Sequence, residues 1–215
     1  SALSANLGLS LDLLADVIRN PAFAPEEVNR VRVQQLAGIA AELQDPGSVA
    51  GRVLPTLLWG TQHPYAVPGS GSGDIAVVKA LTPAQLSAFH DRWLRPEKAR
   101  IFVVGDTTLA SLVPMLEKSF GTWRVTGEAP PAKDFAVGIP APRPRIIFVD
   151  RPNAPQSTIL AGMVLDRTGH NDLVGLRAAN EVFGGSFMSR INTDLRETKG
   201  WSYGVSSGIG GEENG

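Results

Sequence analysis

A proline-rich stretch in the middle of the chain limits what this sequence can fold into. Between residues 124 and 144 the apolar residues follow neither a helical nor a strand period. This stretch contains Pro130, Pro131, Pro140, Pro142 and Pro144. Because proline fixes φ and lacks a backbone N–H group, the composition favours an extended linker over a helix or a central strand. We therefore expect two lobes, residues 1–140 and 141–215, that meet near Pro140.

The first lobe is expected to be mostly helical. Its apolar residues recur at helical spacing in several segments. Thr82 and Gln85 have the spacing of a capping box, and Pro83 occupies the first helical position, which together predict a helix start. The expected helices are residues 9–19, 25–43, 48–59, 83–93 and 109–116, and the expected strand is residues 101–104.

The second lobe combines strand and helix patterns. Short apolar or alternating segments predict strands, and spacings of three and four residues predict helices. The expected strands are residues 145–150, 156–163 and 201–205, and the expected helices are residues 172–183 and 188–196.

Arg196 and Tyr203 lie seven residues apart across an expected helix-to-strand turn. Ser186 is expected to cap the helix and Gly200 to end it, so that Arg196 falls in the last turn. A guanidinium and a phenol are both strong donors, and together they could bind a carbonyl oxygen or an oxyanion. The alternative is that Arg196 complements the helix C-terminus or pairs with a carboxylate, while Tyr203 is an ordinary strand aromatic.

Composition excludes several classes of function. Lys and Arg total 20 and Asp and Glu total 21, so the formal net charge is −1. Without a basic excess, neither nucleic acid nor an anionic membrane surface is an expected partner. The sequence has no cysteine, which excludes disulfides, thiolate zinc sites and a cysteine nucleophile. It also lacks an apolar run of about 18 residues, so we expect no membrane span.

Several blocks of the sequence together point to one known family. They are NEVFGGSFMSRINTDLRETKGWSYGVSS at residues 180–207, residues 14–46, which contain NPAFAPEEV and end on LQDP, His63-Pro64-Tyr65, residues 81–106, Asp150-Arg151-Pro152 and Pro155-Gln156-Ser157. These blocks cover nearly the whole chain and resemble the pitrilysin/insulinase family of zinc metallopeptidases, in the order in which that family has them. Residues 180–207 are similar to a segment of the family's second domain.

The resemblance implies an α+β fold in which a layer of helices covers an antiparallel sheet. It also implies parts of two homologous processing-peptidase-like domains. Residues 1–140 are expected to be the later part of the first domain and to end in the proline-rich linker. Residues 141–215 are expected to be the earlier part of the second domain, C-terminally incomplete, because the final GIGGEENG ends on no cap or core element.

The zinc chemistry of that family needs residues that this chain does not have. Family members bind zinc with an inverted H-x-x-E-H motif and a distant glutamate. The three histidines, His63, His90 and His170, are too far apart to share a helical face, and each is interpreted as structural. The resemblance places Gly38 at the position of the distant glutamate; Glu42, four residues on, would require a gap. We therefore predict no metal or other cofactor in this chain, and zinc in a partner subunit or an upstream domain.

The resemblance is greatest to the family's non-catalytic subunits, which carry an arginine and a tyrosine at these positions. It implies that Arg196 and Tyr203 bind the substrate backbone and support the oxyanion, while a partner with the H-x-x-E-H motif activates water. The expected substrate is an unfolded peptide, and the expected assembly is a heterodimer or a fused pair of halves. The chain alone is predicted to be inactive, and a bacterial periplasmic location is favoured over a cytoplasmic one.

Two alternatives stay open at this point. The parent protein could carry an H-x-x-E-H motif upstream of this chain and be a catalytic zinc peptidase. It could instead be a purely structural or assembly subunit without a peptidase role, as some members of the family are in respiratory complexes.

Overall fold

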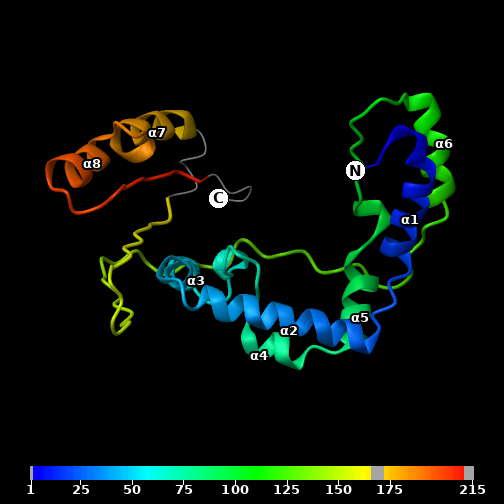
Figure 1. Ribbon diagram of the computed structural model, residues 1–215, viewed down its shortest axis with the longest axis horizontal. Coiled ribbons are helices and arrows are strands. Elements are labelled where there is room, and N and C mark those ends of the chain that lie inside the picture. The colour runs from blue at the N-terminus through cyan, green and yellow to red at the C-terminus, as the bar shows by residue number, and fades with distance from the viewer. Residues whose placement is uncertain (1, 166–171, 211–215) are drawn as a thin grey trace. The chain divides into compact units, whose positions relative to one another are not determined.

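A computed structural model describes residues 2–165 and 172–210 of this protein (Figure 1). Within these ranges no helix has both the length and the apolar composition needed to cross a membrane. The α-helices are α1 (Leu7–Arg19), α2 (Pro25–Glu42), α3 (Pro46–Trp59), α4 (Ile75–Ala80), α5 (Pro83–Trp93), α6 (Leu109–Phe120), α7 (Leu173–Asn180) and α8 (Arg190–Asn192). The 3₁₀ helices are η1 (Ser4–Asn6), η2 (Pro64–Ala66) and η3 (Pro96–Lys98), and the π-helices are η5 (Glu181–Gly185) and η6 (Thr193–Thr198).

The described residues contain no β-strand, so the expected α+β fold with an antiparallel sheet is wrong. The four segments expected to be strands lie in irregular structure, and apolar side chains in them are exposed: Phe102 is 86% exposed, Ile146 96% and Ile159 89%. An alternating pattern is a local property, whereas a strand exists only where a second strand accepts and donates its backbone hydrogen bonds. No such pairing forms among the described residues.

The expected helices of the first lobe are confirmed, with ends that shift by a few residues. The helix α5 begins with the predicted capping box: Thr82 accepts from the Gln85 backbone, and the Gln85 side chain accepts from the Thr82 backbone. The helix α4 was not expected, although its start has a local signal. The carboxylate of Asp74 accepts hydrogen bonds from the N–H groups of Ala76 and Val77, which is the role of an N-cap residue.

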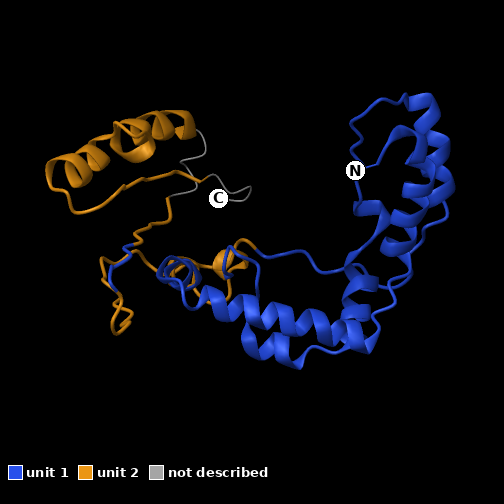
Figure 2. Ribbon diagram, in the orientation of Figure 1, with its two compact units in different colours: residues 1–53, 67–134, 155–159 blue, residues 54–66, 135–154, 160–215 orange. Residues whose placement is uncertain are grey.

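The chain divides into two compact units that alternate along the sequence (Figure 2). Unit 1 consists of residues 1–53, 67–134 and 155–159, and unit 2 of residues 54–66, 135–154 and 160–215. The division into homologous domains at residues 1–140 and 141–215 stays a prediction.

Two helix pairs form the apolar core of unit 1. The helix α1 packs against α6, where Leu11, Ala15 and Leu112 are buried. The helix α2 packs against α4, where Ile39 is fully buried and Val78 is 8% exposed. Each pair thus buries a few apolar side chains and leaves the opposite helix faces exposed, as amphipathic helices do.

An aromatic cluster holds the first part of unit 2. The ring of His63 stacks on Trp59 with centroids 4.7 Å apart, and Tyr65 lies edge-on to Trp59 at 5.2 Å. Phe135 contacts both His63 and Tyr65, at 6.2 and 5.2 Å between centroids. These contacts join the end of α3 to Phe135, which lies within the proline-rich stretch of residues 124–144.

The C-terminal part of unit 2 is a chain of short helices followed by an extended segment. The π-helix η5 contacts both α7 and α8, and α8 continues into η6. Residues 201–208, which we call the terminal segment, return along these helices, and the N–H of Ser207 donates to the carbonyl of Gly184 at 2.9 Å. A Cβ atom at Gly184 would collide with Ser207, so this close approach requires glycine.

Candidate functional site

The turn that carries Arg196 forms largely as the sequence predicts. Arg196 lies in the last turn of η6, and Gly200 follows with φ +64°, a left-handed conformation that suits glycine. The N–H of Trp201 donates to the carbonyl of Leu195 at 2.9 Å and closes the helix end. These two expectations are confirmed.

Ser186 does not cap the helix as expected. The π-helix η5 extends to Gly185, and α8 begins only at Arg190, with Ser189 at the N-cap position. The hydroxyl of Ser186 instead donates to the carbonyl of Glu181 at 3.3 Å. The side chain of Ser189 makes no capping bond either, and its buried hydroxyl has no hydrogen-bond partner among the described residues.

The structure brings Arg196 and Tyr203 together and adds a second aromatic ring. The guanidinium carbon of Arg196 lies 4.8 Å from the ring centroid of Tyr203 and 4.7 Å from that of Phe187. Its Nη1 donates to the backbone carbonyl of Tyr203 at 3.0 Å, and its Nε lies 3.0 Å from Oε1 of Glu197. We call Phe187, Arg196 and Tyr203 the aromatic clasp.

The aromatic clasp leaves donors available. Tyr203 is 90% exposed and Phe187 63% exposed, while 28% of the Arg196 side chain is exposed. Neither Nη2 of Arg196 nor the hydroxyl of Tyr203 has a hydrogen-bond partner in the described part of the chain. An arginine edge and a phenol can both donate to a carbonyl oxygen or an oxyanion. Arg196 also pairs with a carboxylate, that of Glu197, which is the alternative that the sequence left open.

Two asparagines that sequence reasoning missed tie the terminal segment to the helices. Asn192 is 3% exposed; its Nδ2 donates to the carbonyl of Phe187 at 2.7 Å, and its Oδ1 accepts from the N–H of Val205 at 2.9 Å. Asn180 donates to the carbonyl of Ser207 at 2.9 Å and accepts from its hydroxyl at 2.7 Å. These partners lie up to 27 residues away, so no short-range sequence pattern announces them.

The position expected for the family's distant glutamate lies in unit 1, on α2. Gly38 has open space where a Cβ atom would stand. Glu42, one turn later, is engaged elsewhere: its Oε2 accepts from Ser72 at 2.8 Å and from Nη1 of Arg52 at 2.7 Å. The hydrogen bond from Ser72 and the contact with Arg52 outweigh desolvation and hold the pKa of Glu42 below its usual value. Glu42 therefore anchors the loop of residues 69–73.

The two described histidines have the structural roles that were expected. Nδ1 of His63 accepts from the N–H of Tyr65 at 3.2 Å within the aromatic cluster. His90 connects α5 to α1, with Nε2 2.6 Å from the carbonyl oxygen of Ile18 and Nδ1 2.9 Å from Oδ1 of Asp91. His170 lies outside the described residues. Across residues 2–165 and 172–210, no three histidine, aspartate or glutamate side chains come close enough to hold a metal ion.

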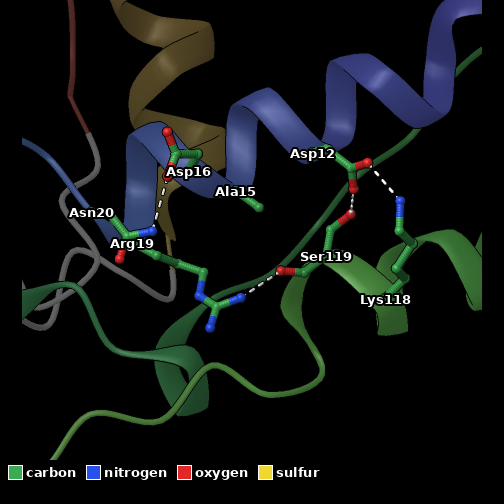
Figure 3. A pocket seen from close by; sticks show the side chains of 7 residues that line it. All are labelled: Asp12, Ala15, Asp16, Arg19, Asn20, Lys118 and Ser119. Carbon is green, nitrogen blue, oxygen red and sulfur yellow. Dashed lines mark hydrogen bonds and ion pairs between the residues drawn. The ribbon is translucent and has the colours of Figure 1, made fainter.

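A polar pocket lies between α1 and α6 (Figure 3). The carboxylate of Asp12 contacts Nζ of Lys118 at 2.6 Å and the hydroxyl of Ser119 at 2.9 Å, and Nη1 of Arg19 donates to the Ser119 carbonyl at 2.9 Å. Asn20 donates to Asp16 at 2.9 Å. The hydrogen bonds from Lys118 and Ser119 hold the pKa of Asp12 below its usual value. The Asp12–Lys118 ion pair and the hydrogen bonds that Asp12 and Arg19 make with Ser119 join the two helices.

Comparisons with known proteins extend these observations. A protein of Mycobacterium tuberculosis named as an uncharacterized zinc protease is 31% identical over 207 residues, which are 96% of this chain and 46% of that protein. A Bacillus subtilis protein also named as an uncharacterized zinc protease is 24% identical over 206 residues, 95% of this chain and 48% of that protein. The chain thus spans about half the length of these relatives.

A solved structure and a family model agree with these relatives. The crystal structure of a peptidase M16 inactive domain from Pseudomonas fluorescens matches with a TM-score of 0.69 and 23% identity, over 96% of this chain and 48% of that one. At this identity the likeness concerns the fold alone. The family model described as peptidase M16 inactive domain matches residues 80–214. Since that match covers more than half of the residues, this chain belongs to the peptidase M16 inactive domain family, and the resemblance to the pitrilysin/insulinase peptidases is confirmed.

Proposed function

We propose that this chain is the non-catalytic part of an M16 zinc peptidase and that Arg196 and Tyr203 bind the substrate for a partner. The observation that carries the proposal is the aromatic clasp, in which the guanidinium contacts two aromatic rings while Nη2 and the Tyr203 hydroxyl stay available in the described part of the chain. The partner is a subunit or domain that bears the H-x-x-E-H motif and carries out the hydrolysis.

The match to an inactive domain supports a non-catalytic role, and the relatives named as zinc proteases support a peptidase context. Gly38 supports it further, because glycine offers no side-chain ligand for zinc at the position where the family has a glutamate. The remaining half of each relative's length leaves room for a second domain, and a separate partner chain is the other arrangement.

The expected substrate is an unfolded peptide. An extended peptide presents carbonyl oxygens that are not paired in secondary structure, and these accept hydrogen bonds from a guanidinium and a phenol. As a tetrahedral oxyanion develops, donors placed in advance bind it more strongly than they bind the ground-state carbonyl. Arg196 and Tyr203 would then contribute more to the rate constant than to peptide affinity.

The test compares Arg196→Ala and Tyr203→Phe in the full-length protein assembled with its zinc-bearing partner. Loss of one transition-state donor should lower kcat/KM for an unstructured peptide by about 10²-fold. Peptide cleavage and the thermal unfolding midpoint would be measured on the same preparations. If both variants cleave the peptide as fast as the wild-type assembly, the proposed role is wrong.

A second candidate is that the parent protein is itself a catalytic zinc peptidase with its H-x-x-E-H motif upstream of this chain. The relatives' names favour it, since both are called zinc proteases. Metal analysis of the full-length parent, purified without partners, separates the two candidates. Stoichiometric zinc together with peptide cleavage would support the second candidate, and a metal-free, inactive parent would support the first.

A further inference from the structure

Asn192 is a buried polar side chain beside the aromatic clasp, and both ends of its amide bind backbone groups. It is 3% exposed, and its amide connects two backbone groups that are distant in sequence, the carbonyl of Phe187 and the N–H of Val205. Phe187 carries one ring of the aromatic clasp, and Val205 lies two residues after Tyr203, which carries the other ring. The side chain thus fixes the chain at both sides of Arg196.

The chemistry of the two hydrogen bonds requires an amide. Nδ2 donates to a carbonyl at 2.7 Å, and Oδ1 accepts from an N–H at 2.9 Å. A carboxylate has no proton for the Phe187 carbonyl, and an alanine reaches neither group. A side chain with both a donor and an acceptor on one short stem satisfies both backbone groups, and both hydrogen bonds are partly buried.

Among the hydrogen bonds of the described residues, those of Asn192 alone connect the backbone of Phe187 to the terminal segment. The helix α8 has three residues, and Phe187 and Tyr203 are both largely exposed, so packing does not hold either ring in place. Nη1 of Arg196 donates to the Tyr203 carbonyl, and the N–H of Trp201 donates to the Leu195 carbonyl, but both contacts hold the terminal segment to η6 and not to the Phe187 backbone. The amide of Asn192 is therefore the described link that spans both rings.

We propose that Asn192 is a positioning residue that sets the spacing of the Phe187 and Tyr203 rings and thereby holds the Arg196 guanidinium in place. This inference rests on the proposed function for its catalytic consequence but not for its structural one. Without the amide, the terminal segment moves away from Phe187, and Arg196 loses the ring stacking on one face. Its free N–H groups then no longer point to one fixed place.

The comparison of Asn192→Asp with Asn180→Asp tests the proposal. Asn180 provides the matched control because it also binds the terminal segment through both ends of its amide, but at Ser207, beyond the clasp. Both variants lose one donor to a backbone carbonyl, and both should lower the thermal unfolding midpoint. Only Asn192→Asp should disturb Arg196.

The first readout is the ¹H–¹⁵N resonance of the Arg196 Nε–H in the full-length protein, assigned by its loss in Arg196→Lys. Two stacked rings shift this resonance, and Asn192→Asp should move it toward the position of an exposed arginine, while Asn180→Asp leaves it in place. An unchanged resonance in Asn192→Asp overturns the proposal, whatever the enzyme assay shows.

The second readout is peptide cleavage by the assembly with the zinc-bearing partner. Asn192→Asp should lower kcat about tenfold with little change in KM, since a small misplacement of a catalytic group affects the reacting geometry first. In an Arg196→Ala background the same substitution should have no further effect, because residues that act through one another are not additive. If the two effects multiply in full, Asn192 acts independently and the proposal is wrong. If Arg196→Ala alone leaves cleavage unchanged, the proposed function fails, and the resonance still decides the positioning role.

Discussion

Arg52 in unit 1 and Arg196 in unit 2 show two ways in which the same side chain is used. Nη1 of Arg52 contacts Glu42 at 2.7 Å and the Ser72 hydroxyl at 2.5 Å, and its Nη2 donates to the Gly73 carbonyl at 2.6 Å. Its side chain is 16% exposed. These N–H groups of Arg52 bind Glu42 and the loop of residues 69–73, so Arg52 has a structural role.

Arg196 is held in part by aromatic rings. Its guanidinium carbon lies 4.7 and 4.8 Å from the ring centroids of Phe187 and Tyr203, while Nη1 and Nε contact the Tyr203 carbonyl and Glu197. A cation–π contact needs no N–H group, so the two rings help to hold the guanidinium without consuming the N–H groups of Nη2. The comparison teaches that an arginine held partly by aromatic rings can still donate to a ligand, whereas one surrounded by acceptors cannot.

The largest expected effect comes from replacing Arg196 by lysine. Lysine keeps the charge but has neither the flat surface for stacking nor the forked donors. In the full assembly, Arg196→Lys should lower kcat/KM about 10- to 100-fold. Arg52→Lys is the matched control and should change kcat/KM by less than about twofold. Full activity in Arg196→Lys would mean that charge alone suffices and that the stacking has no functional role.

Removing the charge at Arg52 should affect stability instead of activity. Arg52→Gln leaves Glu42 without its cation and the Gly73 carbonyl without its donor. We expect the thermal unfolding midpoint to fall by roughly 3–6 °C. The control is Arg100→Gln, an exposed arginine of the same unit for which the structure describes no partner, and it should change the midpoint by less than about 1 °C. Equal shifts in the two variants would mean that the contacts of Arg52 add no more to stability than an exposed arginine does.

The helices could be predicted because their signals are short-range. The Thr82–Gln85 capping box and Gly200 act within four residues of the helix ends that they define, and the structure confirms both. Strands could not be predicted in the same way. The alternating residues 201–205 bind helix residues through Asn192 and not a neighbouring strand, and no local pattern specifies which partner a segment meets.

The same distinction divides the candidate site. Arg196 and Tyr203 were found because both stand in one short motif. Phe187 and Asn192 were missed because their contribution depends on contacts that form only after α8 and the terminal segment have come together. The sequence around Asn192 shows only a polar residue within the expected helix 188–196. A polar residue on an exposed helix face gives the same pattern, so the sequence does not predict a buried role for Asn192.

A third side chain, His90, carries a positive charge in a structural contact and can lose that charge as the pH rises. Burial opposes the charge of His90, but the hydrogen bonds to the Ile18 carbonyl and to Asp91 outweigh it and hold its pKa above 6.5. Both ring nitrogens face acceptors, and Phe23 covers the ring edge-on. Protonation therefore lets both ring nitrogens donate, and the Nε2 contact with Ile18 is the one that joins α5 to α1.

The sign of the effect follows from the raised pKa. The folded state binds the proton more tightly than the unfolded state, so the stabilisation is complete below the ordinary value of 6.5 and is lost as pH rises through the raised pKa. We expect the free energy of unfolding to fall as the pH rises from about 6 to about 8. His90→Gln keeps a donor for Ile18 but cannot titrate, and its unfolding curve should lack this decrease. A decrease of the same size in His90→Gln would assign the pH dependence to other groups.

The smallest effect separates the two rings of the clasp. Phe187→Leu keeps an apolar contact but removes one aromatic face, and an exposed cation–π contact contributes about 0.5–1 kcal/mol. The expected loss in kcat/KM is therefore about two- to fivefold, well below that of Tyr203→Phe, which keeps the ring and removes the hydroxyl. Phe183→Leu is the control, since Phe183 is 54% exposed and makes no described contact with the guanidinium. If Phe187→Leu and Tyr203→Phe were equal in effect, the ring of Phe187 would matter as much as a direct donor.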